Sequence, residues 1–240
     1  MDKYAKSIYD YSLNILSGEE PFSFSKSLIK GKSSRCIEIP WVCNHIKSKT
    51  PQSIFDVGMS LSCIEYLGIL LELKNKYKTT IEAVDIIKPE RVKSRYPAEW
   101  RNAILDIPVS IGDIRTMSLK ESQYDMVTCI SVIEHIGFDR PSESHPDSVF
   151  ERTKDVNNLN TKRSGTTNNE VLAAIKKVLK PSGKLLITVP MGSGGPVILK
   201  DSLGYYCVQW EYNQESWDDI LLHKDFTVAE EHYFKLSKTL

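Results

Sequence analysis

The chain has 240 residues, of which 41% are hydrophobic, with 31 lysines and arginines balanced by 31 aspartates and glutamates. This length and composition support one substantial hydrophobic core, so we expect a single domain with additions. The formal net charge of zero gives no support for a nucleic-acid partner, because a phosphate backbone is bound by a basic surface.

The cysteine pattern and the hydropathy of the sequence indicate which cellular compartment the protein occupies. The five cysteines form no C-x-x-C pair, which favours a reduced, cytoplasmic protein. The first residues, MDKYAKSIYDYS, lack the apolar core of a signal peptide. No apolar run reaches the roughly 20 residues of a membrane span. The five histidines have no metal-ligand spacing, so no metal site is predicted.

Residues 1–50 are predicted to form an N-terminal helical segment ahead of the main domain at 51–240. Four apolar side chains recur at helical spacing and predict one packed stripe: Tyr4, Ile8, Tyr11 and Ile15. Pro40 is predicted to open a second, short helix, because proline suits a first helical turn.

From residue 53, apolar strands alternate with amphipathic helices. Strands are predicted at 53–57, 79–87, 109–114, 124–133, 183–190 and 226–234. Helices are predicted at 61–77, 169–180 and 215–224. The pattern predicts a Rossmann-like α/β fold, a doubly wound and mostly parallel sheet with helices on both faces. Its final helix–strand pair predicts an antiparallel edge strand. The polar stretch 138–167 is predicted to be a long loop, which in a compact domain is typically functional or mobile.

Ligands of a doubly wound sheet bind beyond the carboxyl ends of its strands. The first strand leads into FDVGMSLS (residues 55–62), where Gly58 predicts a tight turn. Serine stands at positions 60 and 62, where a phosphate-binding loop has glycine, and the loop has no lysine. It therefore suits a nucleoside without phosphates, provided that the serine backbone keeps a negative φ. The hydroxyl of Ser60 could then meet a ligand carboxylate.

Acidic residues stand at the ends of the next two strands. Asp85 ends the second strand, where a carboxylate can accept hydrogen bonds from both hydroxyls of a ribose. Asp113 and Ile114 follow the third strand and suit the edge and face of an adenine, the carboxylate accepting from the exocyclic amine. The alternative for both aspartates is structural, because Asp commonly stabilises a turn.

Five segments resemble, in their order and spacing, the class I S-adenosylmethionine-dependent methyltransferases. They are IFDVG, AVDI, IGDIRTM, YDMVTCISVIEHIG and VLKPSGKLLITVP, and together they cover roughly residues 53–192. Within that family, IEIPWV at 37–42 and IEHIG before a long loop are most similar to bacterial methyltransferases found with surface-polysaccharide and other sugar-modifying enzymes.

The resemblance implies S-adenosyl-L-methionine as cofactor. It places the cofactor site at Asp56, Gly58, Ser60, Asp85, Asp113, Ile114 and Ser131. The methyl-transfer face would carry Glu134 and His135. His135 is the first candidate for a general base, and Glu134 and His145 are the reserves. The structural alternatives are a satisfied Glu134–His135 pair and a solvated His145.

We therefore expect methyl transfer to an oxygen or nitrogen of a small molecule, preferably a sugar or sugar-nucleotide. Its acceptor pocket would be built from the N-terminal segment, the loop at 138–167 and residues 192–217. An Mg²⁺-assisted variant stays open. The first alternative is a non-catalytic methyltransferase-like binding or scaffold protein, favoured by the altered loop. The second is a nucleoside- or NAD-dependent enzyme, which the missing glycines disfavour.

Overall fold

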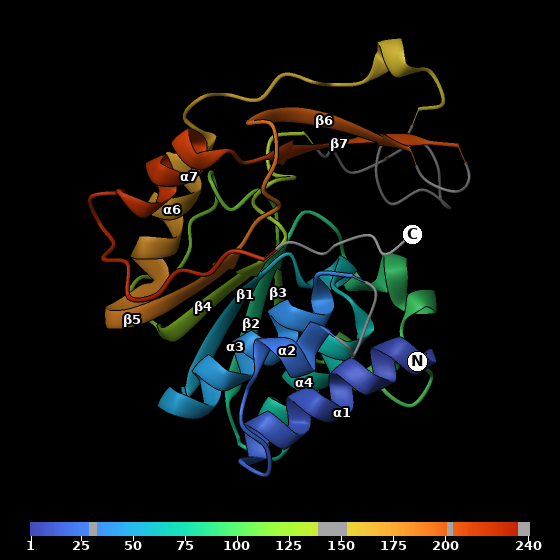
Figure 1. The fold of residues 1–240 in the computed structure, drawn as a ribbon, viewed down its shortest axis with the longest axis vertical. Coiled ribbons are helices and arrows are strands. Elements are labelled where there is room, and N and C mark those ends of the chain that lie inside the picture. The colour runs from blue at the N-terminus through green and yellow to red at the C-terminus, as the bar shows by residue number, and fades with distance from the viewer. Residues whose placement is uncertain (29–32, 139–152, 201–203, 235–240) are drawn as a thin grey trace.

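The computed structural model describes residues 1–28, 33–138, 153–200 and 204–234 of the chain (Figure 1). A central parallel sheet has the strand order β3-β2-β1-β4-β5. Its strands are β1 (Ser53–Val57), β2 (Thr80–Asp85), β3 (Val109–Ile111), β4 (Tyr124–Ile130) and β5 (Leu179–Thr188). Chain order reverses between β1 and β4, so the crevice of a doubly wound sheet lies at their carboxyl ends. The predicted Rossmann-like sheet is confirmed.

Helices cover both faces of this sheet (Figure 1). On one side lie α1 (Lys3–Ser17), α2 (Phe24–Leu28), α3 (Arg35–Lys49) and α4 (Ile64–Asn75), and on the other α6 (Thr167–Val178) and α7 (Gln214–Leu221). The shorter elements are α5 (Arg101–Leu105) and the 3₁₀ helices η1 (Met59–Leu61), η2 (Pro89–Arg95) and η3 (Val156–Asn158). Successive side chains of β1 point to opposite faces of the sheet and so pack in two different cores. Ile54 packs with the N-terminal helices, whereas Phe55 and Val57 pack with α6 and α7.

The N-terminal helices are integrated into the first of these cores. Ile8, Tyr11 and Ile15 are buried as predicted, but Tyr4, in the first turn of α1, is 42% exposed. The prediction for Pro40 was wrong, because α3 begins at Arg35 and contains the proline. Pro40 lies past the first turn, so α3 continues through it without the backbone hydrogen bond to the Cys36 carbonyl that another residue would donate.

Antiparallel pairing occurs in a separate hairpin and not at 226–234. Strands β6 (Gly195–Lys200) and β7 (Tyr206–Glu211) pair with each other, whereas residues 226–234 form no strand. Side-chain contacts hold this last segment instead: Glu231 accepts a hydrogen bond from the Trp217 indole at 2.5 Å, and His232 packs on Phe24.

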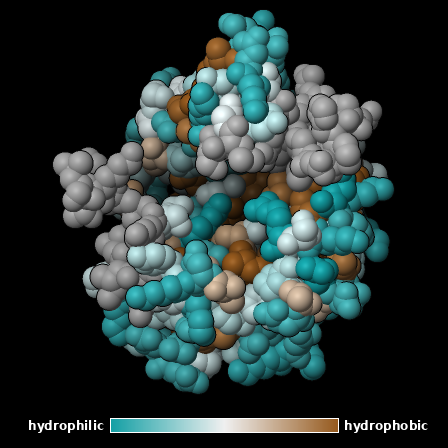
Figure 2. Space-filling view, turned by 90° about the vertical axis from the view of Figure 1, so that its right-hand side faces the viewer, coloured by the Kyte–Doolittle hydropathy of each residue, from teal (hydrophilic) through white to brown (hydrophobic). Residues whose placement is uncertain are grey.

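The hairpin lies at the carboxyl end of β4. The backbone N–H of Trp210 in β7 donates at 2.9 Å to the carbonyl of Glu134, which lies in the turn that follows β4. The described end of the predicted long loop, 153–167, contains η3 and pairs with the hairpin through a bridge from Thr153 to Tyr206. Figure 2 shows a hollow across the middle of the molecule, with hydrophobic side chains exposed inside it. Within the described part of the chain, no helix is both long and apolar enough to cross a membrane.

Candidate functional site

A pocket of about 240 Å³ opens at the carboxyl ends of β1 to β4. It brings together six of the predicted site residues: Gly58, Asp85, Asp113, Ile114, Ser131 and His135. Three others lie behind its wall and do not line it: Asp56, Ser60 and Glu134. His145 lies outside the described residues. The pocket also contains Arg35 from α3, to which the sequence analysis assigned no role.

The turn after β1 requires glycine at position 58. Gly58 has a φ of 86°, and a Cβ atom added there would lie 2.6 Å from a methyl group of Val132. Its N–H donates to the Val84 carbonyl at 2.8 Å, which ties the turn to β2. Neither Ser60 nor Ser62 adopts a positive φ, so the two serines cause no backbone strain.

Ser60 acts within the protein. It is buried, and its N–H donates to Asp85 Oδ2 at 2.8 Å. Its hydroxyl donates to the Ile87 carbonyl at 2.7 Å, and its own carbonyl accepts from the Tyr96 hydroxyl at 2.9 Å. These three bonds fasten the β1 loop to the segment after β2.

Asp85 is the carboxylate at the centre of this loop contact. Its Oδ1 accepts from the Ile87 N–H and its Oδ2 from the Ser60 N–H, both at 2.8 Å. Burial raises the pKa of Asp85, and the two backbone hydrogen bonds act in the opposite direction. A carboxylate oxygen can accept more than one hydrogen bond. Because Asp85 also lines the pocket, it can still receive ligand hydroxyls.

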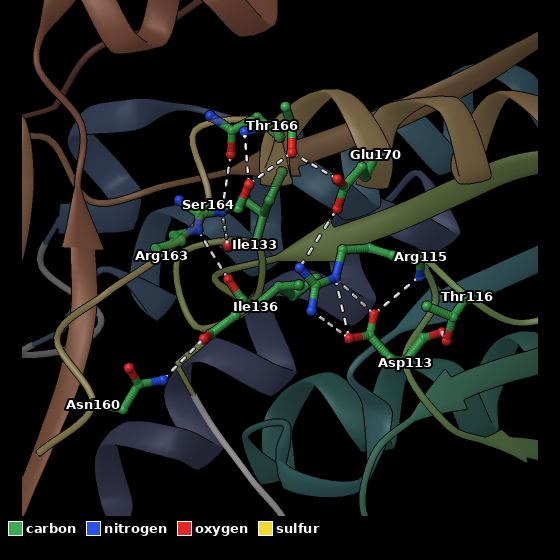
Figure 3. Close-up of polar contacts among 12 residues, drawn as sticks. Asp113, Arg115, Thr116, Ile133, Ile136, Asn160, Arg163, Ser164, Thr166 and Glu170 are labelled. Atoms are coloured by element: carbon green, nitrogen blue, oxygen red, sulfur yellow. Dashed lines mark hydrogen bonds and ion pairs between the residues drawn. The ribbon is translucent and has the colours of Figure 1, made fainter.

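Asp113 lines the same pocket in an ion pair with Arg115 (Figure 3). The Arg115 Nε–H donates to Asp113 Oδ1 at 2.9 Å, and Nη2 donates to Oδ2 at 2.5 Å. The side-chain hydrogen bonds from Arg115 lower the pKa of Asp113, so the carboxylate is ionised. A ligand amine would share this carboxylate with Arg115, while the buried Ile114 offers an apolar surface beside it.

Asp56 lies below the pocket, between β1, α4 and β4. Its Oδ2 accepts hydrogen bonds from the Tyr66 hydroxyl and the Thr128 hydroxyl, each at 2.7 Å. Burial raises its pKa to about 7, although these two bonds oppose the rise. The position supports a role in holding the strands together beneath the site.

Replacing Asp56 with asparagine is expected to flatten the pH dependence of stability. The pKa of Asp56 is raised from 3.8 to about 7, so its contribution is complete below 3.8 and is lost as the pH rises to about 7. Each pKa unit corresponds to about 1.4 kcal/mol. Urea unfolding should therefore show a fall of a few kcal/mol between acidic and neutral pH in the wild type and a smaller fall in the variant. An equal fall in both would contradict a protonated Asp56.

Helix α3 reaches the pocket through Arg35, and the buried Glu38 on the same helix holds this arginine and Ser131. Ser131, which follows β4 with a φ of 50°, donates its hydroxyl to Glu38 Oε1 at 2.9 Å. The Arg35 Nη1 donates to Glu38 Oε2 at 2.8 Å. Among the described lining residues, the acidic groups are the carboxylates of Asp85, which ends β2, and Asp113, which follows β3. The spacing of Arg35 and Glu38, three apart on one helix, was the available sequence signal.

Glu134 and His135 point to different surroundings. His135 lines the pocket, and burial lowers its pKa, as do the positive charges of Arg35 and Arg163. A hydrogen bond with the Val208 backbone opposes this effect. Glu134 is buried away from the pocket, and burial raises its pKa to about 8. Both shifts favour the uncharged form: the neutral imidazole of His135 and the protonated carboxyl of Glu134.

Comparisons with known proteins give structural likenesses only. No protein-family model matches the chain, and no curated protein is similar to it in sequence. The PH0226 protein from Pyrococcus horikoshii OT3 is similar at 15% identity and a TM-score of 0.47, over 78% of each chain. An S-adenosylmethionine-dependent methyltransferase from Clostridium acetobutylicum ATCC 824 is similar at 11% identity and a TM-score of 0.46, over 88% of this chain and 84% of that one. These values assign the chain to no family.

A third similar structure is the 1,6-didemethyltoxoflavin-N1-methyltransferase of Burkholderia thailandensis, at 14% identity and a TM-score of 0.44, over 91% of this chain and 76% of that one. The pocket of this chain is therefore the evidence for its function. Within the described residues, no three His, Cys, Asp or Glu side chains form a group that could hold a metal ion.

Proposed function

We propose that the chain is an S-adenosyl-L-methionine-dependent methyltransferase that acts on an oxygen or nitrogen of a small molecule. The observation that carries the proposal is the distribution of charge in the pocket. Asp85 ends β2, Asp113 follows the neighbouring β3, and Arg35 enters from α3, where one of its nitrogens is paired with Glu38. A ligand that joins a nucleoside to an amino acid matches this set, because its hydroxyls and amine need acceptors and its carboxylate needs a cation.

The residues present fit this cofactor better than a dinucleotide. Gly58 lines the pocket and, having no Cβ, lets the backbone of the β1 loop pack directly against Val132. Asp85 lines the pocket next to Ile86 and can accept from ribose hydroxyls. A pyrophosphate would need backbone N–H donors in the β1 loop, but the Ser60 N–H is already bonded to Asp85.

S-adenosyl-L-methionine supplies, when bound, a methyl group on a positively charged sulfur. The protein's part is to hold the acceptor in line with that group and to take up the acceptor's proton. His135 is the base that we propose for this proton, because it lines the pocket as a neutral imidazole. Glu134 and His145 are the reserve bases expected from the sequence, but Glu134 does not line the pocket and His145 lies outside the described residues, so neither supports the proposal. A sugar or sugar-nucleotide acceptor is proposed from the sequence resemblance alone.

Replacing Arg35 with methionine is expected to lower the affinity for S-adenosylhomocysteine by about 10- to 100-fold, because a hydrogen bond to a charged group contributes about 1.5–3 kcal/mol. Methylthioadenosine has the nucleoside but no amino-acid end, so its affinity should be unchanged. Calorimetric titration with both ligands measures the difference. Equal weakening of both ligands would show that Arg35 supports the pocket without binding the carboxylate.

The test of activity is transfer of a labelled methyl group from S-adenosyl-L-methionine to a small-molecule extract. The proposal predicts a labelled product that the wild type forms and that a His135→Gln variant forms much more slowly. A wild type that binds S-adenosylhomocysteine but labels no small molecule would favour the alternative of a non-catalytic binding or scaffold protein.

A further inference from the structure

The turn that carries His135 has little support of its own. It follows β4 and lies between two residues with positive φ, Ser131 at 50° and Gly137 at 99°. Within the turn, backbone hydrogen bonds join residues three positions apart. For example, the His135 N–H donates to the Val132 carbonyl at 2.9 Å. A short turn of this kind holds one shape only if other groups fix its carbonyls.

Arg163, in the described end of the predicted long loop, provides that support (Figure 3). Its Nε–H donates to the Ile136 carbonyl at 2.9 Å, and its Nη2 donates to the Ile133 carbonyl at 2.8 Å. The same Nη2 donates to Asn168 Oδ1 at 2.9 Å, at the start of α6. One guanidinium therefore spans both sides of the His135 turn and ties it to a helix.

The same guanidinium also joins the turn to the hairpin region. It lies over the Trp210 ring of β7, with 5.6 Å from Cζ to the ring centroid, and its Nη1 lies 3.4 Å from the Tyr212 hydroxyl. Gly137 allows this approach, because a Cβ added there would lie 3.2 Å from Arg163 Cγ. The neighbouring Asn160 amide donates to the Gly137 carbonyl at 3.3 Å.

We propose that Arg163 is a positioning residue that fixes the His135 turn against the hairpin and so sets the place of the His135 imidazole in the pocket. The inference rests on the proposed function, because His135 matters there as the base. Lysine cannot replace the arginine in this role: its single ammonium has no planar fork that reaches two carbonyls in fixed directions.

The experiment compares wild type, Arg163→Lys and Arg163→Met by ¹⁵N NMR titration of His135, assigned with a His135→Gln variant. The charged groups around this imidazole are Arg35 from α3 and Arg163 itself, and Val208 of β7 contributes its backbone. Arg101→Met is the matched control, because Arg101 also donates to two carbonyls, those of Lys93 and Tyr96.

In both Arg163 variants we expect the His135 titration to move upward toward the ordinary histidine pKa, because a released turn exposes the ring to water. A shift of the His135 pKa in Arg163→Lys reports the loss of the two-pronged guanidinium contact, because lysine keeps the positive charge. S-adenosylhomocysteine affinity should stay within about fivefold of wild type, because Gly58, which follows β1, and Asp85, which ends β2, lie outside the turn that Arg163 holds. The Arg101 control should leave His135 unchanged.

Two results would overturn the inference: an unchanged His135 titration in Arg163→Lys, or an equal shift in the Arg101 control. Loss of S-adenosylhomocysteine binding in the Arg163 variants together with the shift would also overturn it, as it would make Arg163 a general stabiliser. Failure of the proposed function appears separately, as a wild type that binds no S-adenosylhomocysteine while the His135 titration still differs between wild type and variants.

Discussion

Replacing Gly58 with alanine is expected to abolish S-adenosylhomocysteine binding and to lower the free energy of unfolding by about 2–5 kcal/mol. Two effects add. The backbone has a φ of 86°, which an L side chain rarely adopts, and the new methyl group would lie 2.6–2.7 Å from both Cγ atoms of Val132. Because Gly58 and Val132 both line the pocket, relief of the clash deforms the cofactor site itself.

The matched control for Gly58→Ala is Gly165→Ala, where an added Cβ meets nothing within 4 Å. This control should unfold at nearly the wild-type urea concentration and bind ligand normally. Combining Gly58→Ala with Val132→Ala removes the steric part and should recover some stability but not all, because the backbone strain remains. A stable Gly58→Ala protein that binds S-adenosylhomocysteine as tightly as wild type would contradict the structure of this turn.

Replacing Asp85 with asparagine is expected to weaken S-adenosylhomocysteine binding by about 100-fold or more, since two hydrogen bonds to a carboxylate contribute about 1.5–3 kcal/mol each. The variant also loses stability. Both carboxylate oxygens accept backbone N–H bonds, from Ile87 and Ser60, and the amide nitrogen of asparagine would face one of these donors. A buried donor without an acceptor costs about 1–3 kcal/mol.

Calorimetric titration and urea unfolding measure the two effects of Asp85→Asn separately. The control is Asp10→Asn, which removes an exposed ion pair with Lys6 and should change stability by at most about 1 kcal/mol. If Asp85→Asn lost stability but kept full ligand affinity, Asp85 would be a structural residue of the loop and not the ribose ligand.

The sheet and the strand-end residues could be predicted because buried strands leave a local pattern. Apolar runs located β1, β2, β4 and β5, and a parallel sheet brings their carboxyl ends to one edge. That geometry is enough to bring Asp85, Asp113 and His135 into one pocket. The question raised by the serines of the β1 loop also has an answer in the structure: neither Ser60 nor Ser62 has a positive φ.

The partners of these residues could not be predicted, because they lie far away in the sequence. Ser60 bonds Ile87, 27 residues later, and Ser131 bonds Glu38, 93 residues earlier. Nothing local to α3 indicates which strand end it meets. The hairpin was missed for a related reason: β6 and β7 form a separate two-stranded sheet, and their short strands do not continue the alternation of the main sheet.

Calorimetric titration of the wild type with S-adenosylhomocysteine measures directly whether the pocket beyond β1 to β4 binds S-adenosyl-L-methionine. We expect saturable binding at one site per chain, weakened by Asp85→Asn and by Arg35→Met and not competed by NAD. No binding by the folded wild type, or binding that NAD displaces, would contradict it.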